Sequence, residues 1–225
     1  MNRLMIGALL LTAFGALNTQ PAYKEETTAK EKTEEIARPL VKKDVYVPNP
    51  QLPDDMKLNQ IGQNVSDAKG ELTLKAYKKV NETLNVGPIE VKVKEMKVMH
   101  ATPDYSMIDF FHGYTHDEDF DIVKMNVEIK NNTDKKINFS PVAFLETDRG
   151  EHLTWEDDIY LEELAGEIEG NGSKSGNIGF ILNDGNILGI SVMTSDAVDE
   201  EGEVLAKGKS AEFAFKRICI NALEI

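Results

Sequence analysis

The sequence predicts an all-β protein, a sandwich of about seven to nine short strands with one short helix. First, apolar and polar residues alternate with a period of two from residue 70 onward, as expected of strands with one buried face. Second, clusters of turn-forming residues, such as Asn131–Asp134, separate these segments. Third, the segments are short and follow one another without long helical patterns between them. Many short strands joined by turns favour a β-sandwich over a βαβ arrangement.

The clearest strand is Val123–Lys130, in which four apolar residues alternate strictly with four polar ones. Its buried face is expected to carry Val123, Met125, Val127 and Ile129, and its solvent face Lys124, Asn126 and Glu128. In the segment 89–98 the alternation changes phase between Val93 and Met96, which predicts a β-bulge. Further strands are expected near residues 72–76, 138–145, 176–182, 187–193 and 211–218, and the short helix over residues 157–166.

The first 22 residues have the pattern of a secretory signal peptide. Arg3 precedes the apolar run Leu4–Leu17, in which only Thr12 is polar. A helix of that length spans about 21 Å, which is too short for a hydrocarbon core of about 30 Å. Cleavage is expected after the Ala13–Gly15 motif or after Ala22. The alternative is a buried N-terminal helix.

Residues 23–61 are expected to form a flexible tether, and residues 62–225 the sandwich domain. The tether is rich in charged residues and threonine and is interrupted by Pro39, Pro48, Pro50 and Pro53. Such a segment buries too little apolar surface to offset its ordering entropy. Within it, residues 45–47 could add a short edge strand.

Composition excludes several classes of protein. The formal net charge of −14 disfavours binding to nucleic acids and to anionic lipid surfaces. The single cysteine, Cys219, can form neither an internal disulfide bond nor a cysteine-based zinc site. The fold must therefore be stabilised by a hydrophobic core.

The segment 109–121 carries the strongest candidate for a metal site. It contains two histidines and five carboxylates, which are ligand types that zinc and calcium accept. The candidate ligands are Asp109, His112, His116, Asp117 and Asp119. Their spacing fits no known metal-binding loop, so the alternative is an exposed acidic loop. No other cofactor is expected.

A second acidic run covers residues 146–169, with ten carboxylates and only Arg149 opposing them. It is expected to form a solvated negative face. The alternative is a docking surface for a basic partner or for divalent cations. The glycine-rich segment 170–176 does not match a phosphate-binding loop, because Ile168 and Ser173 stand where glycines are required.

No catalytic motif is present in the sequence, which lacks the Gly-x-Ser-x-Gly nucleophile elbow. The prediction is a protein without enzymatic activity and without catalytic residues. A hydrolase whose site is assembled from distant residues is an alternative.

Three segments together resemble a known family. They are Val80–Val91, the strand Val123–Asn132 followed by Ile137–Pro141, and the glycine-flanked segment Gly172–Phe180. They are similar to the secreted and lipoprotein-type immunoglobulin-like domains of Gram-positive bacteria, whose fold is related to the mycobacterial immunoprotective extracellular antigen. The resemblance implies a surface-located immunoglobulin-like sandwich without assigned catalytic residues. Phe14 stands where many members carry the lipidated cysteine.

These observations lead to one functional expectation. The chain is expected to be an exported, non-enzymatic interaction module at the cell surface or in the extracellular medium, with an unidentified protein or cell-wall partner. No transmembrane span is expected after signal cleavage. The alternative function is binding of a divalent cation through the segment 109–121.

Overall fold

The structure is a computed structural model that describes residues 48–215. The expected signal peptide (residues 1–22), residues 23–47 of the expected tether and Cys219 lie outside the described residues.

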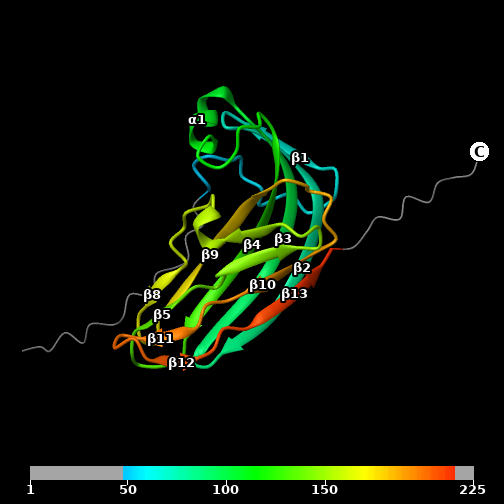
Figure 1. The fold of residues 1–225 in the computed structure, drawn as a ribbon. Helices are drawn as coiled ribbons and strands as arrows, with labels where there is room; N and C mark the ends of the chain where they lie inside the picture. The colour runs from blue at the N-terminus through cyan, green and yellow to red at the C-terminus, as the bar shows by residue number, and fades with distance from the viewer. Residues whose placement is uncertain (1–47, 216–225) are drawn as a thin grey trace, which may run out of the picture. The chain divides into compact units, whose positions relative to one another are not determined.

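The largest sheet has five antiparallel strands in the order β1-β2-β3-β4-β9 (Figure 1). Their bounds are β1 Asn64–Asp67, β2 Gly70–Val86, β3 Ile89–Pro103, β4 Phe120–Asn131 and β9 Ser173–Leu182. The long strands β2 and β3 form a hairpin closed by a two-residue turn that contains Gly87, whose φ of 57° suits glycine. Strand β9 is one edge of this sheet.

Two smaller sheets complete the sandwich. One has the order β13-β10-β6-β7 and the other β12-β11-β5-β8. Their strands are β5 Ile137–Phe139, β6 Phe144–Thr147, β7 His152–Thr154, β8 Gly166–Ile168, β10 Gly189–Met193, β11 Ala197–Asp199, β12 Val204–Ala206 and β13 Ser210–Ala214. The helical elements are the 3-10 turns η1 Tyr105–Met107 and η2 Trp155–Asp157, and the helix α1 Ile108–Phe111.

The predicted fold class is confirmed, since the described residues form antiparallel sheets with one short α-helix. Residues 48–215 contain thirteen strands, more than the seven to nine expected. The excess comes from three-residue strands such as β5, β8 and β12, which are too short to show an alternating pattern.

The main core lies between the large sheet and the two smaller ones. It includes the four apolar residues of β4 that the sequence assigns to the buried face: Val123, Met125, Val127 and Ile129. The predicted bulge in β3 is also present. The pairing with β4 passes from Val93 opposite Val127 to Glu95 opposite Asn126, which leaves Lys94 as the extra residue.

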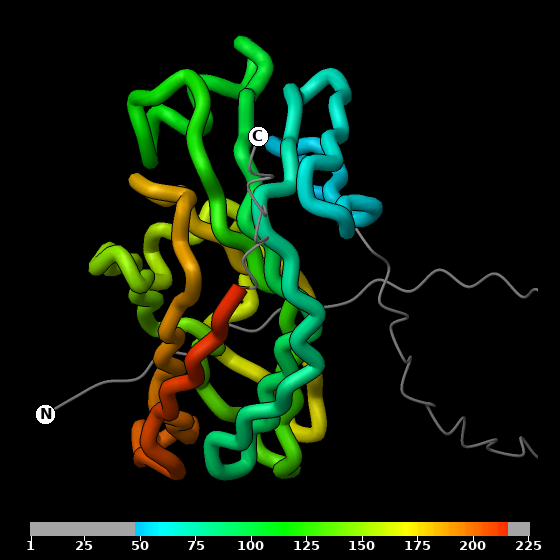
Figure 2. Tube along the Cα trace, turned by 90° about the vertical axis from the view of Figure 1, so that its right-hand side faces the viewer, coloured from blue at the N-terminus to red at the C-terminus, as the bar shows by residue number. Residues whose placement is uncertain are grey.

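A second core covers the opposite face of the large sheet near one end. On β3, Val98 belongs to the main core and its neighbour Met99 to the second one, so both faces of this strand are buried. The segment 48–61 supplies part of this cover through Leu52 and Leu58, which are 1% and 3% exposed. In Figure 2 this N-terminal segment lies at the same end of the sheet as the loop that contains α1.

Two expectations need correction. Residues 48–61 belong to the packed domain rather than to a flexible tether, because their leucines are buried in the second core. The expected helix over residues 157–166 is absent from the described chain, where η2 ends at Asp157, the first residue of that range. Leu161 and Glu163 have φ values of 53° and 51°, which a right-handed helix cannot accommodate.

Candidate functional site

A pocket of about 650 Å³ opens where η2, the loop after it and β8 meet strand β9 and the turn between β5 and β6. This volume is within the range of about 300–1,000 Å³ that is typical of ligand sites. The lining residues are mostly apolar with a set of carboxylates: Ser140, Pro141, Val142, Trp155, Glu156, Asp158, Leu161, Glu163, Leu164, Ala165, Glu167, Lys174 and Ile178. We take this pocket as the candidate site.

The base and the rim of the pocket differ in exposure. Val142, Leu164 and Ile178 belong to the main core and are at most 5% exposed. Trp155 and Leu161 are 56% and 57% exposed. Large apolar side chains that remain in water beside an apolar pocket mark surfaces that bind other molecules.

Trp155 is held in place by its backbone. Its N–H donates to the carbonyl oxygen of Ala143 over 3.2 Å. The preceding Thr154 donates from its N–H and its hydroxyl to the carboxylate of Asp157, over 2.7 and 3.0 Å. These contacts fix the backbone at the start of η2, from which the exposed indole extends.

The loop after η2 covers the outer edge of β9. The carboxylate of Asp158 accepts the N–H of Gly179 over 2.9 Å, and the N–H of Ile159 donates back to the Gly179 carbonyl oxygen over 2.9 Å. An exposed strand edge would otherwise present unpaired backbone groups. The loop therefore stabilises the sheet as well as lining the pocket.

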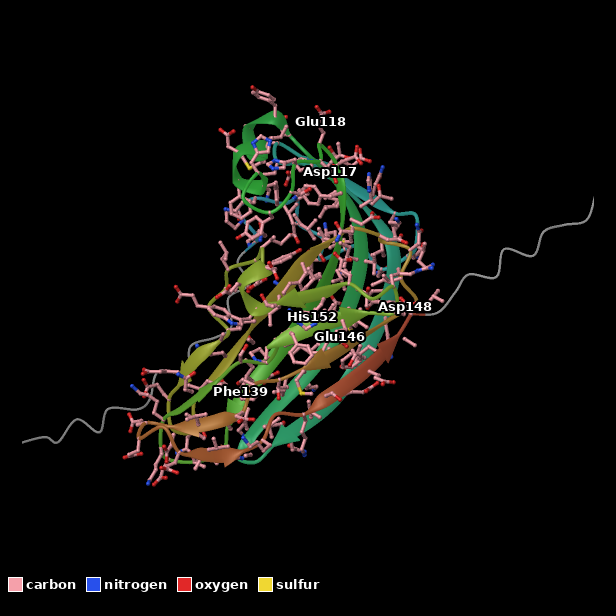
Figure 3. The ribbon with its side chains drawn as sticks, viewed as in Figure 1. Asp117, Glu118, Phe139, Glu146, Asp148 and His152 are labelled. Atoms are coloured by element: carbon pink, nitrogen blue, oxygen red, sulfur yellow. The ribbon has the colours of Figure 1, made fainter. Side chains whose placement is uncertain are left out.

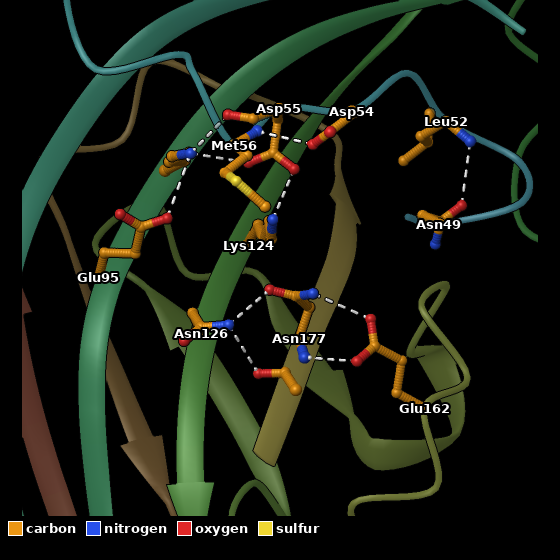
Figure 4. Close-up of polar contacts among 12 residues, drawn as sticks. Asn49, Leu52, Asp54, Asp55, Met56, Glu95, Lys124, Asn126, Glu162 and Asn177 are labelled. Atoms are coloured by element: carbon orange, nitrogen blue, oxygen red, sulfur yellow. Dashed lines mark hydrogen bonds and ion pairs between the residues drawn. The ribbon is translucent and has the colours of Figure 1, made fainter. Parts of the chain in front are cut away.

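Glu162 extends this cover along β9, as Figure 4 shows. Its two carboxylate oxygens accept from the backbone N–H and the side-chain amide of Asn177, over 3.0 and 2.9 Å. The amide oxygen of Asn177 in turn accepts from the Asn126 side chain over 2.9 Å. The pocket wall is thus joined by hydrogen bonds to β9 and β4.

Backbone strain coincides with the rim of the pocket. Leu161 and Glu163 lie in the left-handed region of backbone conformation, which costs a non-glycine residue on the order of 1–2 kcal/mol. Such strain persists only where surrounding contacts impose it, and it is concentrated at functional sites. Here the contacts of the neighbouring Asp158 and Glu162 with β9 impose it.

In the described part of the chain, some charged groups of the pocket have hydrogen-bond partners and others have none. Burial raises the pKa of the Asp158 carboxyl, and the hydrogen bonds that it accepts from backbone N–H groups oppose this only in part. Lys174 is the single basic residue in the lining, and its ammonium donates to the carbonyl oxygens of Glu163 and Ala165 over 2.8 and 3.1 Å. Within residues 48–215, no hydrogen bond or ion pair engages the exposed carboxylates of Glu156 and Glu163.

Of the five predicted metal ligands, all of them among the described residues, only His112 and His116 are brought close together, with ring centroids 6.2 Å apart. Asp109, His112, His116, Asp117 and Asp119 are all exposed. No group of three or more histidine, cysteine, aspartate or glutamate residues within residues 48–215 could hold a metal ion. Figure 3 shows Asp117 at the α1 end of the domain.

One member of that set has a different partner. Asp119 lies 3.4 Å from His100 Nε2, and the other nitrogen of the same ring lies 3.0 Å from Asp121 Oδ1. Asp121 also pairs with Lys75 over 2.8 Å. These contacts join neighbouring strands, and they explain part of the acidic segment as ordinary surface pairing.

The second acidic run, residues 146–169, is divided among several roles. Glu151 accepts from the backbone and side chain of Asn183, and Glu146 pairs with His152. The carboxylates that line the pocket also belong to this acidic run. Sequence reasoning recognised the run but did not single out Trp155, the only tryptophan of the chain, which lies in its middle.

A buried ion cluster joins the N-terminal segment to the large sheet (Figure 4). Asp55 is 3% exposed and lies 2.8 Å from Lys97 and 2.5 Å from Lys124. Lys97 also lies 3.2 Å from Glu95. Lys124 was expected on a solvent face, and it is buried because the segment 48–61 covers that face.

Comparison with known proteins identifies a close relative. The chain is 42% identical over 206 residues to YdhF, an uncharacterised protein of Bacillus subtilis strain 168, and the match covers 84% of this chain and 87% of YdhF. No family model matches the sequence.

The solved structures are more distant. A Listeria monocytogenes EGD-e protein of unknown function aligns with a TM-score of 0.49 and 14% identity, covering 65% of this chain and 89% of that one. The ycdA protein of Bacillus subtilis aligns with a TM-score of 0.38 and 18% identity, covering 60% of this chain and 39% of that one. No helix among the described residues has the length and hydropathy needed to cross a membrane.

Proposed function

We propose that this chain, which belongs to the family of the Bacillus subtilis protein YdhF, is an exported, non-enzymatic interaction module of the bacterial cell surface or extracellular medium. In this proposal the pocket beside Trp155 is the surface that binds a partner. The observation that carries it is the exposure of Trp155 and Leu161 at the rim of an apolar pocket.

Export is supported by the sequence of residues 1–22, with Arg3 before the apolar run Leu4–Leu17. The immunoglobulin-like assignment is part of the same proposal. It is supported by the segments that resemble the family and by the antiparallel sheets packed around one main core.

The binding role is supported by the way in which the rim is built. Hydrogen bonds between the loop after η2 and strand β9 fix the backbone around Leu161, and the capping contacts of Thr154 fix the backbone at Trp155. A binding surface that is ordered before the partner arrives loses less conformational entropy on association. An exposed aromatic residue on such a support is a typical anchor of an interface.

The non-enzymatic part of the proposal is supported by the role of Asp158. Its pKa is raised, which in a pocket would suit a general acid. However, the carboxylate accepts hydrogen bonds from the backbone N–H groups of Gly179 and Tyr160. A carboxyl group used in this way holds the strand edge and has little freedom to exchange a proton with a ligand.

Export is tested by producing the full chain in Bacillus subtilis and separating cytosol, envelope and medium. The chain should be found in the envelope or the medium, and mass spectrometry should give an N-terminus between residues 16 and 23. An intact Met1 in the cytosolic fraction would contradict this part of the proposal.

The binding role is tested by adding the labelled mature protein to Bacillus subtilis cells. The parent protein should be retained on the cells, and Trp155→Ala should lose most of that retention. The matched control is Tyr105→Ala, which removes another exposed aromatic residue (88% exposed) outside the pocket. Equal retention of the parent and the Trp155 variant would refute a role for the pocket.

A further inference from the structure

Apart from the indole N–H of Trp155, the unengaged side-chain groups of the pocket are hydrogen-bond acceptors. Glu156 and Glu163 present free carboxylates, which accept hydrogen bonds and cannot donate them when ionised. The other side-chain donors are already engaged, since Lys174 donates to two backbone carbonyl oxygens and the Ser140 hydroxyl donates to the carbonyl oxygen of Val142 over 2.7 Å. A ligand must therefore supply the donors.

The net negative charge of the pocket lining also favours a ligand that donates hydrogen bonds and carries positive charge. Four carboxylates line the pocket against one ammonium group, and they belong to Glu156, Asp158, Glu163 and Glu167. Glu167 pairs with Lys136 on the surface over 3.2 Å. Because neighbouring carboxylates repel one another, a bound cation would relieve repulsion in addition to forming its own ion pairs.

The apolar part of the site adds a second requirement. The indole of Trp155 at the rim can attract a cation through a cation–π interaction. The cation is either the planar guanidinium group of arginine, which can stack on the ring, or the ammonium group of lysine. The base formed by Val142, Leu164 and Ile178 suits an aliphatic side chain. A ligand that satisfies both has a cationic group next to an aliphatic one.

We propose that the pocket binds a basic peptide segment of another protein, in which an arginine or a lysine adjoins an aliphatic side chain. This inference rests on the proposed function and names the chemistry of its partner. The cation lies between Trp155 and the carboxylates of Glu156 and Glu163, and the aliphatic side chain enters the pocket. A neutral glycan fits less well, because it carries no positive charge to offset the repulsion among the carboxylates.

The chain contains its own probe, since Trp155 is its only tryptophan. The ligand used is a blocked hexapeptide of alternating leucine and arginine with a fluorescent label. Its affinity is measured by fluorescence anisotropy, and unlabelled peptide is titrated while the emission of Trp155 is recorded. Binding should change this emission and should weaken as ionic strength rises.

The charge requirement is tested on both partners. The citrulline form of the peptide, in which neutral ureas replace the guanidinium groups, should bind at least about tenfold more weakly. The double variant Glu156→Gln with Glu163→Gln should lose a similar factor for the arginine peptide. The control is Glu200→Gln with Glu201→Gln, two exposed carboxylates between β11 and β12, and it should bind as the parent does.

The outcomes separate this inference from the proposed function. Equal affinity for the arginine and citrulline peptides, an unaffected double variant, binding without a change in Trp155 emission, or no binding at millimolar peptide overturns the inference. So does binding of a tetramer of N-acetylglucosamine at the pocket in place of the peptide. If Trp155→Ala still abolishes retention on cells, the proposed function stands with a different ligand; if it does not, both fall.

Discussion

At the scale of single residues, the most constrained group is the buried carboxylate of Asp55. Burial alone would raise its pKa, but the ammonium groups of Lys124 and Lys97 outweigh burial and hold the pKa below the ordinary value. Lys97 is affected in the complementary way. Burial alone would lower its pKa, and the charge of Asp55 raises it. Each charge is tolerated in the interior only because the others are present.

Replacing Asp55 should therefore be costly. In Asp55→Asn, Lys124 remains buried without its counterion and Lys97 keeps only Glu95, so the free energy of unfolding at neutral pH should fall by about 3–5 kcal/mol. Denaturant unfolding measures this. The control Asp134→Asn, at an exposed carboxylate, should change stability by less than about 0.5 kcal/mol.

The lowered pKa of Asp55 also predicts that the effect of Asp55→Asn on stability depends on pH. Because the pKa of Asp55 is lowered on folding, its stabilisation is present above its unfolded pKa of about 3.9 and is lost as the pH falls through the lower folded value. The difference in stability between the parent and Asp55→Asn should thus shrink below about pH 4. A difference that stays constant through acid would show that the carboxylate charge is not the cause.

At the scale of elements, the loop after η2 has two roles that are mechanically linked. The side chains of Asp158 and Glu162 point to β9 and satisfy its outer edge, while Trp155 and Leu161 face the solvent at the pocket. The strained backbone at Leu161 is the consequence of serving both sides. Gly179 permits this approach, because a Cβ there would lie 2.5 Å from the ring of Tyr160.

Removing one of these side chains should loosen the edge. Glu162→Ala leaves the N–H and the side-chain amide of Asn177 without their acceptor, which should lower the free energy of unfolding by about 1–3 kcal/mol. Amide exchange at Asn177 should become faster. The control Glu200→Ala should affect neither quantity. Unchanged exchange at Asn177 in the Glu162 variant would mean that the loop does not protect the edge.

The alternation of apolar and polar residues predicted those features of the strands that depend only on the local backbone geometry. Alternation identified the buried face of β4 and the phase change identified the bulge at Lys94, because side-chain direction along a strand has a fixed period. The same logic failed over residues 157–166. The spacing of Tyr160, Leu161 and Leu164 indicated a helix, but the pairing of this loop with β9 is a long-range contact that no spacing encodes.

At the scale of the whole molecule, the features that could not be predicted from the sequence are those formed by segments that lie far apart in the chain. Lys124 occupies an outward position of β4, and it is buried because residues 48–61 lie over it. The candidate site has the same origin. Its apolar base and its acidic rim come from segments near residues 140, 160 and 178, which meet only in the folded sandwich. Acidic residues and the tryptophan were visible in the sequence, but the pocket was not.

The segment 48–61 also determines where the stable domain begins. Leu52 and Leu58 are buried in the second core, and a buried leucine typically contributes about 2–5 kcal/mol relative to alanine. Asp55 from the same segment balances the two buried lysines. A chain that begins at Gly62 loses all three contributions and leaves the second core and the two lysines uncovered.

We therefore expect a chain that begins at Pro48 to unfold cooperatively, and one that begins at Gly62 to have a much lower midpoint or no folded state. Because the missing segment removes an apolar cover and also opens the two lysines to solvent, removing their charges should not restore the stability. Adding Lys97→Met and Lys124→Met to the shorter chain removes these charges but leaves the leucine sites open, so its midpoint should stay below that of the chain that begins at Pro48. The unfolding midpoints of the three chains are compared by thermal unfolding, monitored by circular dichroism. Equal midpoints for the chains that begin at Pro48 and Gly62 would show that residues 48–61 contribute no stability, and would return the domain boundary to residue 62.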